Sequence, residues 1–146
     1  MKKVLSILVL ALVAVQFVIA GEVITRDANQ LPLNARNFIN QYFSKPQISR
    51  IKIDTNLLGS KKYEVLLTDR TEIDFDSNGN WTEVDCKKAA VPGALVPVSV
   101  KEYVKTNFPR EIITKIDRGG SGMEVELAND YSLKFNSKGK FVKMDD

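Results

Sequence analysis

Two stretches of the chain match each other, and this match constrains the fold more than any other feature. Residues 31–53 align with residues 96–118 at an offset of 65, and residues 63–85 align with residues 123–145 at an offset of 60. The offsets differ by five residues in the loop after Asp54, where two copies of one unit tolerate a length change. The pattern predicts an internal repeat. The alternative is chance similarity.

The second pair of stretches shares seven identities in 23 positions, and these fall on turns and alternating apolar positions together. The identical residues of the first copy are Glu64, Val65, Leu67, Phe75, Ser77, Gly79 and Asp85.

Each copy is expected to begin with an amphipathic helix. The apolar positions of each recur with helical spacing. They are Leu31, Ala35, Phe38, Ile39 and Tyr42 in the first copy, and Val96, Val100, Tyr103, Val104 and Phe108 in the second. Pro32 and Pro97 suit a first helical turn, and Pro46 and Pro109 follow the expected helix ends.

Alternating segments follow each helix and predict half-buried antiparallel strands. The predicted fold class is α+β: a tandem repeat of a helix plus a four-stranded antiparallel meander, with the helices packed on one face of the sheet. The expected boundaries are 21–86 for the first repeat, 87–95 for a connector and 96–146 for the second repeat, all in one continuous structural unit.

A hairpin at Asn78-Gly79 sets the expected register, because Asn-Gly favours a two-residue turn. It places Phe75, Ile73, Val84 and Cys86 in the core and Glu72, Asp74, Asp76, Trp81, Glu83 and Asp85 on the open face. In the second copy, Phe135, Leu133, Val142 and Met144 point inward, and Phe141 and Lys143 point outward. A slip of one residue would reverse this assignment.

Trp81 and Phe141 therefore become candidate partner-binding residues, together with Glu83 and Lys143. Exposed aromatic side chains among charges are typical of protein-binding surfaces. The alternative is that neighbouring loops or lysine stems cover the two rings, or that each ring caps a secondary core.

The N-terminus predicts export. Lys2 and Lys3 precede an almost wholly apolar run from Val4 to Ile19, which ends in a pattern that suits signal peptidase. Residues 1–20 are therefore interpreted as a signal peptide, with a membrane anchor as the alternative. The mature chain has 19 basic and 18 acidic residues, a net charge of +1, which offers no electrostatic reason to bind nucleic acid. We expect a periplasmic or secreted protein that leaves the membrane after cleavage.

The chain has no histidine and a single cysteine, Cys86. These absences remove histidine-based triads, histidine general bases and histidine zinc sites. We expect no enzyme activity, no catalytic residues and no cofactor. We expect Cys86 to be buried, with pairing between chains as the alternative.

One motif has the spacing of a calcium loop. Its oxygen-bearing positions are Asp74, Asp76, Asn78 and Asp85, with Gly79 at the bend. Its flanks alternate as strands and not as helices, and the second copy has Lys134, Asn136 and Lys138 at the first three positions. The alternative is a polar hairpin whose Asp and Asn side chains serve the turn.

The segments "FDSNGNW" and "VPGALVP", with helices that end in "YFSKP" and "NFPRE", resemble the secreted PepSY-like family of periplasmic proteins. That family is related in fold to the β-lactamase inhibitor protein, which grips an enzyme with an open sheet face. The resemblance implies no active site and suggests a peptidase or other hydrolase as the partner. The first hypothesis is therefore a protein-binding module, and the second is a small-ligand or calcium-binding envelope protein.

Overall fold

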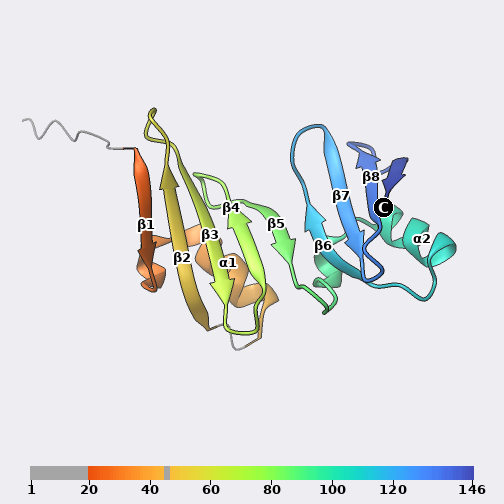
Figure 1. Cartoon of the computed structure of the whole chain (residues 1–146), viewed down its shortest axis with the longest axis horizontal. Helices are drawn as coiled ribbons and strands as arrows, with labels where there is room; N and C mark the ends of the chain where they lie inside the picture. The colour runs from red at the N-terminus through yellow and green to blue at the C-terminus, as the bar shows by residue number, and fades with distance from the viewer. Residues whose placement is uncertain (1–19, 45–46) are drawn as a thin grey trace, which may run out of the picture.

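The computed structural model describes residues 20–44 and 47–146, and its strands form one sheet in chain order (Figure 1). All eight neighbouring pairs are antiparallel. The strands are β1 (Gly21–Thr25), β2 (Ile48–Thr55), β3 (Lys61–Leu67), β4 (Glu72–Phe75), β5 (Trp81–Asp85), β6 (Ile113–Asp117), β7 (Gly122–Leu127), β8 (Ser132–Asn136) and β9 (Phe141–Asp145). The helices are α1 (Leu33–Tyr42) and α2 (Val98–Asn107), and the 3-10 turns are η1 (Ala28–Gln30) and η2 (Gly93–Leu95).

The predicted tandem repeat of a helix plus a four-stranded meander is wrong, although the α+β class is compatible with the structure. The described chain forms a single nine-stranded sheet with two helices. The additional strand, β1, precedes the first helix and pairs with β2. The sheet also continues across the expected repeat boundary, because β5 pairs with β6. An edge strand left unpaired at that boundary would expose backbone donors and acceptors, and the β5–β6 pairing satisfies them.

The β5–β6 junction extends beyond its ladder. Val84 lies opposite Ile116, and both side chains are fully buried. The Cys86 N–H donates to the Thr114 carbonyl at 2.9 Å, and the Arg118 N–H donates to the Thr82 carbonyl at 2.9 Å. Backbone bonds at both ends of the short ladder therefore hold the two parts of the sheet together.

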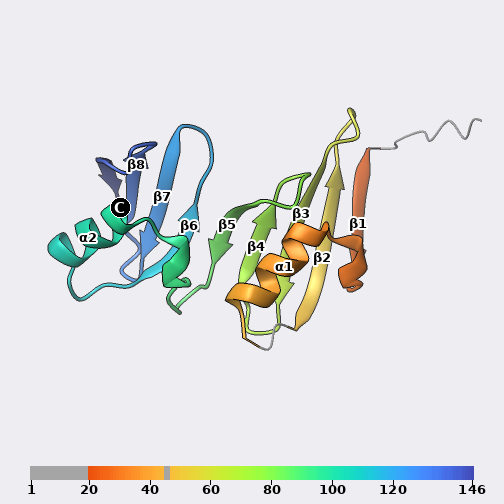
Figure 2. The ribbon, with the colours of Figure 1, turned by 180° about the vertical axis from the view of Figure 1, so that it is seen from behind.

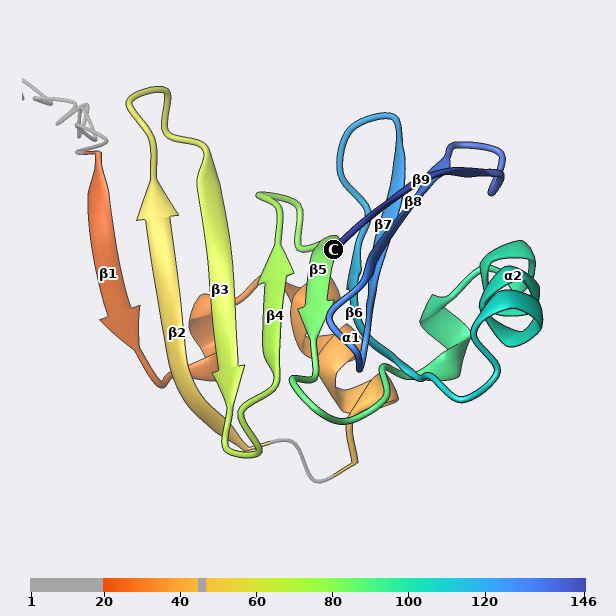
Figure 3. The same cartoon turned by 45° about the vertical axis from the view of Figure 1, so that its right-hand side comes forward.

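Both helices cover the same face of the sheet. Figure 2 shows α1 crossing the strands of the first part, and Figure 3 shows how the sheet turns so that β7 to β9 are seen almost edge-on. Alternate strand residues on the helix side are buried, including Ile51, Val65, Ile73 and Val125. The opposite face carries no helix in the described part of the chain and stays open to solvent.

The helices bury the stripes that the sequence predicts. Ala35, Phe38 and Ile39 are buried on α1, and Val100 and Val104 are buried on α2. Pro32 and Pro97 occupy the N-cap positions, one residue earlier than expected, so both helices begin just after a proline. Pro109 lies beyond the end of α2, whereas Pro46 lies outside the described residues.

Three hairpins use one turn chemistry. Asn56, Asp76 and Asn136 each accept two backbone N–H bonds through Oδ1, from the residues two and four positions later. The glycine three positions later has a positive φ in each turn, 79° at Gly59, 80° at Gly79 and 76° at Gly139. Each of these turns has three loop residues, and the β4–β5 and β8–β9 hairpins also have a bulge beside the turn. The two-residue turn predicted at Asn78-Gly79 is therefore wrong.

The predicted signal peptide, residues 1–20, lies outside the described residues except for Ala20. Among the helices that the structure describes, none combines the length and apolar character needed to span a membrane.

We expect Gly79→Ala to destabilise the fold by at least about 2 kcal/mol, because a left-handed backbone disfavours a Cβ and the turn packs tightly. A Cβ at Gly79 would lie 2.7 Å from the Pro32 Cβ and 3.1 Å from the Ala35 nitrogen. Urea denaturation measures the change. Gly21→Ala is the control, since nothing lies within 4 Å of its Cβ position, and equal losses in the two variants would contradict the explanation.

Candidate functional site: the open face of the sheet

Trp81 lies on the helix side of the sheet and not on the open face. The turn with three loop residues places Trp81 opposite Phe75, where the two-residue turn predicted Thr82, and the bulge between Asp74 and Phe75 then restores the predicted pairing of Asp74 with Glu83. The indole stacks on Phe38 of α1, with ring centroids 5.9 Å apart and an interplanar angle of 25°. The Arg118 guanidinium lies over the same indole at 4.0 Å from its centroid, and Arg118 Nε donates to the Trp81 carbonyl at 2.7 Å. The half-buried ring therefore ties α1 to the end of β6.

Phe141 follows the same pattern. The turn with three loop residues at Asn136 places Phe141 opposite Phe135, and a bulge between Lys134 and Phe135 follows. Its ring stacks on Tyr103 of α2 at 4.6 Å and 12° and meets Phe135 edge-on at 5.9 Å. The prediction that both aromatic rings lie on the open face is wrong because the three-residue turn shifts the register by one position.

β9 is an edge strand, and every one of its residues is exposed. Val142 and Met144 are therefore not core residues, although the alternation predicted that they would be; they are 60% and 47% exposed. In the middle of the sheet the predicted core residues Ile73, Phe75, Val84, Leu133 and Phe135 are buried, as is Cys86. Core prediction failed at the edge because no further strand or helix covers it.

The open face is dominated by charged side chains. Its acidic residues, by strand register, are Glu22, Asp54, Glu64, Glu72, Asp74, Glu83, Asp85, Asp117, Glu124, Glu126 and Asp145. Its basic residues are Arg50, Lys52, Lys62, Lys87, Lys115, Lys134 and Lys143. Eleven carboxylates against seven cations make a net charge of −4.

A row of five carboxylates runs across the strands in the centre of this face; we call it the acidic row. It consists of Glu64, Asp74, Glu83, Asp117 and Glu124, each directly opposite the next on β3 to β7. A lysine lies at each end of the row: Lys52 is opposite Glu64, and Lys134 is opposite Glu124. Like charges directly opposite each other destabilise a sheet, so the acidic row costs stability.

The lysines offset this cost only in part. Lys62 Nζ lies 3.0 Å from Asp74, and Lys115 Nζ lies 3.2 Å from Glu83. Burial nevertheless raises the pKa of Asp74 above its ordinary value, with further contributions from Glu64 and Glu72. Burial also raises the pKa of Glu83, and the neighbouring Asp117 and Asp74 raise it further.

Two of the four predicted binding residues do lie on the open face, but they lie far apart. Glu83 is on β5 and Lys143 is on β9, with three strands between them, which corresponds to about 19 Å. Lys143 pairs with Asp145 at 3.0 Å. The structure therefore does not gather Trp81, Phe141, Glu83 and Lys143 into one surface.

The four predicted calcium ligands also do not converge. Asp76 Oδ1 accepts the N–H groups of Asn78 and Asn80 at 2.9 Å, as a turn residue would. Asp74 pairs with Lys62, and Asp85 pairs with Lys87 at 2.9 Å. Among the residues that the structure describes, no group of three or more acidic, cysteine or histidine side chains is placed to hold a metal ion.

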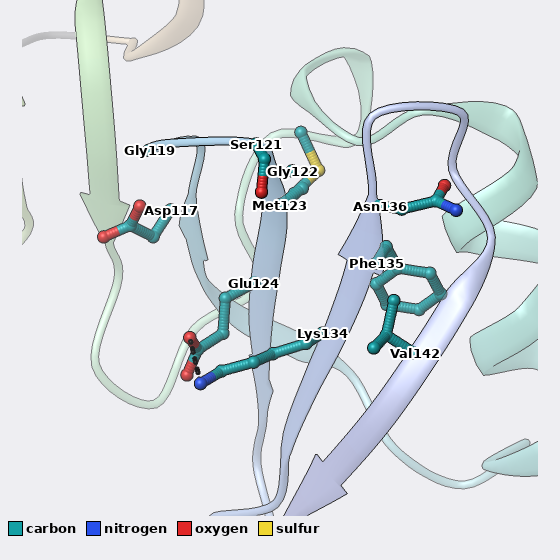
Figure 4. Close-up of a pocket in the computed structure, with 10 residues that line it drawn as sticks. All are labelled: Asp117, Gly119, Ser121, Gly122, Met123, Glu124, Lys134, Phe135, Asn136 and Val142. Carbon is teal, nitrogen blue, oxygen red and sulfur yellow. Dashed lines mark ion pairs between the residues drawn. The ribbon is translucent and has the colours of Figure 1, made fainter.

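One hollow in this region lies where β6 ends and β7 begins. Figure 4 shows Glu124 of β7 paired with Lys134 of β8, with Asp117 on β6 and with Met123 and Asn136 at the rim. The Lys134 Nζ lies 3.7 Å from the Glu124 carboxylate. A second hollow lies over Arg50, Glu64, Asp74 and Glu83. Such surfaces are suited to recognising charge. The thiol of Cys86 is buried, and burial raises its pKa, which lowers the fraction of reactive thiolate.

Three residues of the open face were not predicted from the sequence: Lys115, Asp117 and Glu124. Alternating polar and apolar residues in Ile113–Asp117 and in Gly122–Leu127 indicated that these side chains point away from the core. Only the pairing of β5 with β6 aligns them with Glu83.

We expect Trp81→Ala to lower the free energy of unfolding by about 2–3 kcal/mol, because it removes the stacking on Phe38 and the contact with Arg118. Urea denaturation followed by circular dichroism measures the loss. Leu57→Ala, at a side chain that is 87% exposed, should change stability by less than about 0.5 kcal/mol. A Trp81→Ala protein as stable as Leu57→Ala would contradict the packing role.

Two substitutions on β5 should change the pH dependence of stability with opposite signs. Because the folded-state pKa of Glu83 is raised, its favourable contribution is complete below its unfolded pKa and is lost as the pH rises through the folded pKa. Glu83→Gln should therefore stabilise the protein at pH 7, by about 0.2–1 kcal/mol, and change little near pH 4.

Asp85 is the matched control. Burial alone would raise its pKa, but the Lys87 amine and backbone N–H together hold that pKa below its ordinary value. Its contribution is present above the unfolded pKa and is lost as the pH falls through the folded pKa, so Asp85→Asn should destabilise at pH 7. Thermal melts from pH 3.5 to pH 7.5 check both signs, and a Glu83→Gln protein that melts lower than wild type at pH 7 would contradict the repulsion.

Solved structures with the same fold and related sequences are known. A crystal structure of a putative periplasmic protein of unknown function from Bacteroides vulgatus is 38% identical, with a TM-score of 0.82; the match covers 86% of this chain and 100% of the other. A second putative periplasmic protein from that organism is 36% identical, with a TM-score of 0.79 and coverage of 86% and 97%. A putative calcium-regulated periplasmic protein from Bacteroides thetaiotaomicron is 37% identical, also with a TM-score of 0.79 and coverage of 86% and 97%. None of the curated proteins matches.

Like these relatives, the chain is a periplasmic or secreted protein. Residues 61–143 match the family described as "Putative beta-lactamase-inhibitor-like, PepSY-like". This match runs from β3 into β9 and includes all five carboxylates of the acidic row, with Glu64 near its start. The predicted family resemblance is confirmed, and the chain belongs to the PepSY-like family.

Proposed function

We propose that this protein is an exported, non-catalytic protein-binding module that grips its partner with the open face of the sheet. The observation that carries the proposal is the acidic row, which places five carboxylates opposite one another on an uncovered surface. This arrangement costs stability, and a binding role gives a reason to keep it. A basic partner would relieve the repulsion on contact.

The distribution of charge supports a basic partner. The open face carries −4, whereas the mature chain carries +1, so the rest of the mature chain carries +5. Complementary surface potential speeds association and selects partners. A partner with a basic patch would therefore approach the open face and be repelled by the helix side.

The partner class that we favour is a peptidase or other hydrolase, which the module would restrain or inhibit. The description of the family as inhibitor-like supports this choice. The lack of histidine and the raised pKa of the Cys86 thiol favour binding over catalysis.

The test is capture of envelope and secreted proteins by the purified exported chain. The triple variant Asp74→Asn, Glu83→Gln, Asp117→Asn should capture about tenfold less partner than wild type, because it removes the centre of the acidic row. The matched control, Glu102→Gln, Asp130→Asn, Asp146→Asn, neutralises three exposed carboxylates away from the row and should capture as much as wild type. Inhibition of the captured hydrolase then tests the partner class.

Equal capture by the triple variant and wild type would contradict the surface. A partner that proves not to be a hydrolase would contradict the partner class alone. Because the variant is expected to be at least as stable as wild type, loss of capture does not report unfolding, and a thermal melt of each protein verifies this.

A calcium-dependent role is the second candidate, and it is supported by the calcium-regulated relative at 37% identity. The acidic row offers pairs of facing carboxylates, such as Asp117 with Glu124, that a divalent cation would bridge weakly. The capture experiment therefore includes an arm with 1 mM calcium, and magnesium serves as the control. Capture that changes only with calcium, and only when the acidic row is intact, would favour this candidate.

A further inference from the structure

An apolar groove lies on the helix side of the sheet, between α2, the connector that contains η2, and the start of β6. Its apolar walls come from Val91, Val96, Val104, Phe108, Ile112 and Ile113. It has a volume of about 300 Å³, at the lower end of the range for small-molecule sites, about 300–1,000 Å³. Ile112 is 43% exposed there, so the groove leaves apolar surface in contact with solvent.

Two amines stand at the edge of this groove. Lys101 and Lys105 lie one turn apart on α2, on the same face as Val104 and Phe108. Like charges four residues apart on a helix repel. Within the described chain, neither amine forms an ion pair within 4.0 Å, although the carboxylate of Glu111 also lines the groove.

In the first part of the molecule, the basic residue at the position equivalent to Lys101 has a side-chain partner. Arg36 occupies on α1 the position that aligns with Lys101, and its guanidinium donates to the Asn29 side chain of η1 at 3.3 Å. In the second part, Lys101 instead stands beside Gly93 of η2, whose Cβ position would lie 3.6 Å from the Lys101 Nζ. Ala94, which aligns with Asn29, and Gly93 both lack a side-chain acceptor, so the exposed Lys101 amine has no such partner on η2.

We propose that this groove binds a single acyl chain through its apolar walls and the terminal carboxylate of that chain through Lys101 and Lys105. A mostly aliphatic groove of about 300 Å³ suits one hydrocarbon chain, and two neighbouring amines suit one carboxylate. The ligand class is therefore a fatty acid. The groove lies on the side of the sheet opposite the acidic row, so the inference goes beyond the proposed function and does not depend on it.

The experiment measures binding of dodecanoate to the purified exported chain by isothermal titration calorimetry, with dodecanol as the uncharged comparison. Dodecanoate should bind about tenfold or more tightly than dodecanol, because charge-assisted contacts to two amines act on the carboxylate alone. The Lys101→Gln/Lys105→Gln variant should lose this tenfold preference, and Ile112→Asp should lose binding of both ligands.

Matched controls separate the groove from general effects of charge and apolar surface. Lys138→Gln/Lys140→Gln removes two exposed amines from the β8–β9 turn, and Val98→Asp alters an apolar side chain on α2 that is 69% exposed and does not line the groove. Both should bind dodecanoate as wild type does.

The proposal is overturned if wild type does not bind dodecanoate below its micelle concentration, if dodecanol binds equally well, or if the control variants lose as much affinity as the groove variants. Binding of a peptide with an apolar C-terminus but not of dodecanoate would also overturn it. Unchanged partner capture by the groove variants keeps this result separate from the proposed function.

Discussion

The side-chain-to-backbone turn at Asp76, repeated at Asn136, determines which face of the sheet each neighbouring residue occupies. In each turn the side-chain oxygen of the Asp or Asn accepts hydrogen bonds from two backbone N–H groups, and the turn ends in a glycine with positive φ. The three loop residues place Trp81 opposite Phe75 and Phe141 opposite Phe135, on the helix side of the sheet. A two-residue turn would leave both rings in solvent and remove their contacts with Phe38 and Tyr103.

With both rings on the helix side, the two faces of the sheet differ in polarity. The helix side is apolar, while the open face is a lattice of lysines and carboxylates centred on the acidic row. The short β5–β6 junction completes this lattice, because it brings Glu83 and Asp117 opposite each other. The recognition that we propose for this face is therefore ionic, whereas the groove beside α2 offers an apolar site with a cationic edge.

The helix stripes and most core positions could be predicted from periodicity, because 3.6-residue and two-residue repeats report directly which side of an element is buried. Ala35, Ile39, Val65 and Val125 illustrate this success. Prediction failed at Val142 and Met144 because a strand at the edge of a sheet has the same alternation as one in the middle. It failed at Trp81 because the residue after a turn depends on the number of loop residues, and Asn-Gly fits more than one turn.

By itself, the amino-acid sequence indicated an α+β chain through local periodicity and excluded histidine chemistry through composition. Its motifs indicated the family by resemblance, and its N-terminal segment indicated a periplasmic or secreted location. None of these inferences depends on contacts between residues far apart in the chain. Only the tertiary structure decided that the strands join into one nine-stranded sheet, that Trp81 packs on α1, and that five carboxylates form one row. The physical reason is that strand pairing and register depend on backbone hydrogen bonds between residues far apart in the chain, and a shift of one residue exchanges the two faces of a strand.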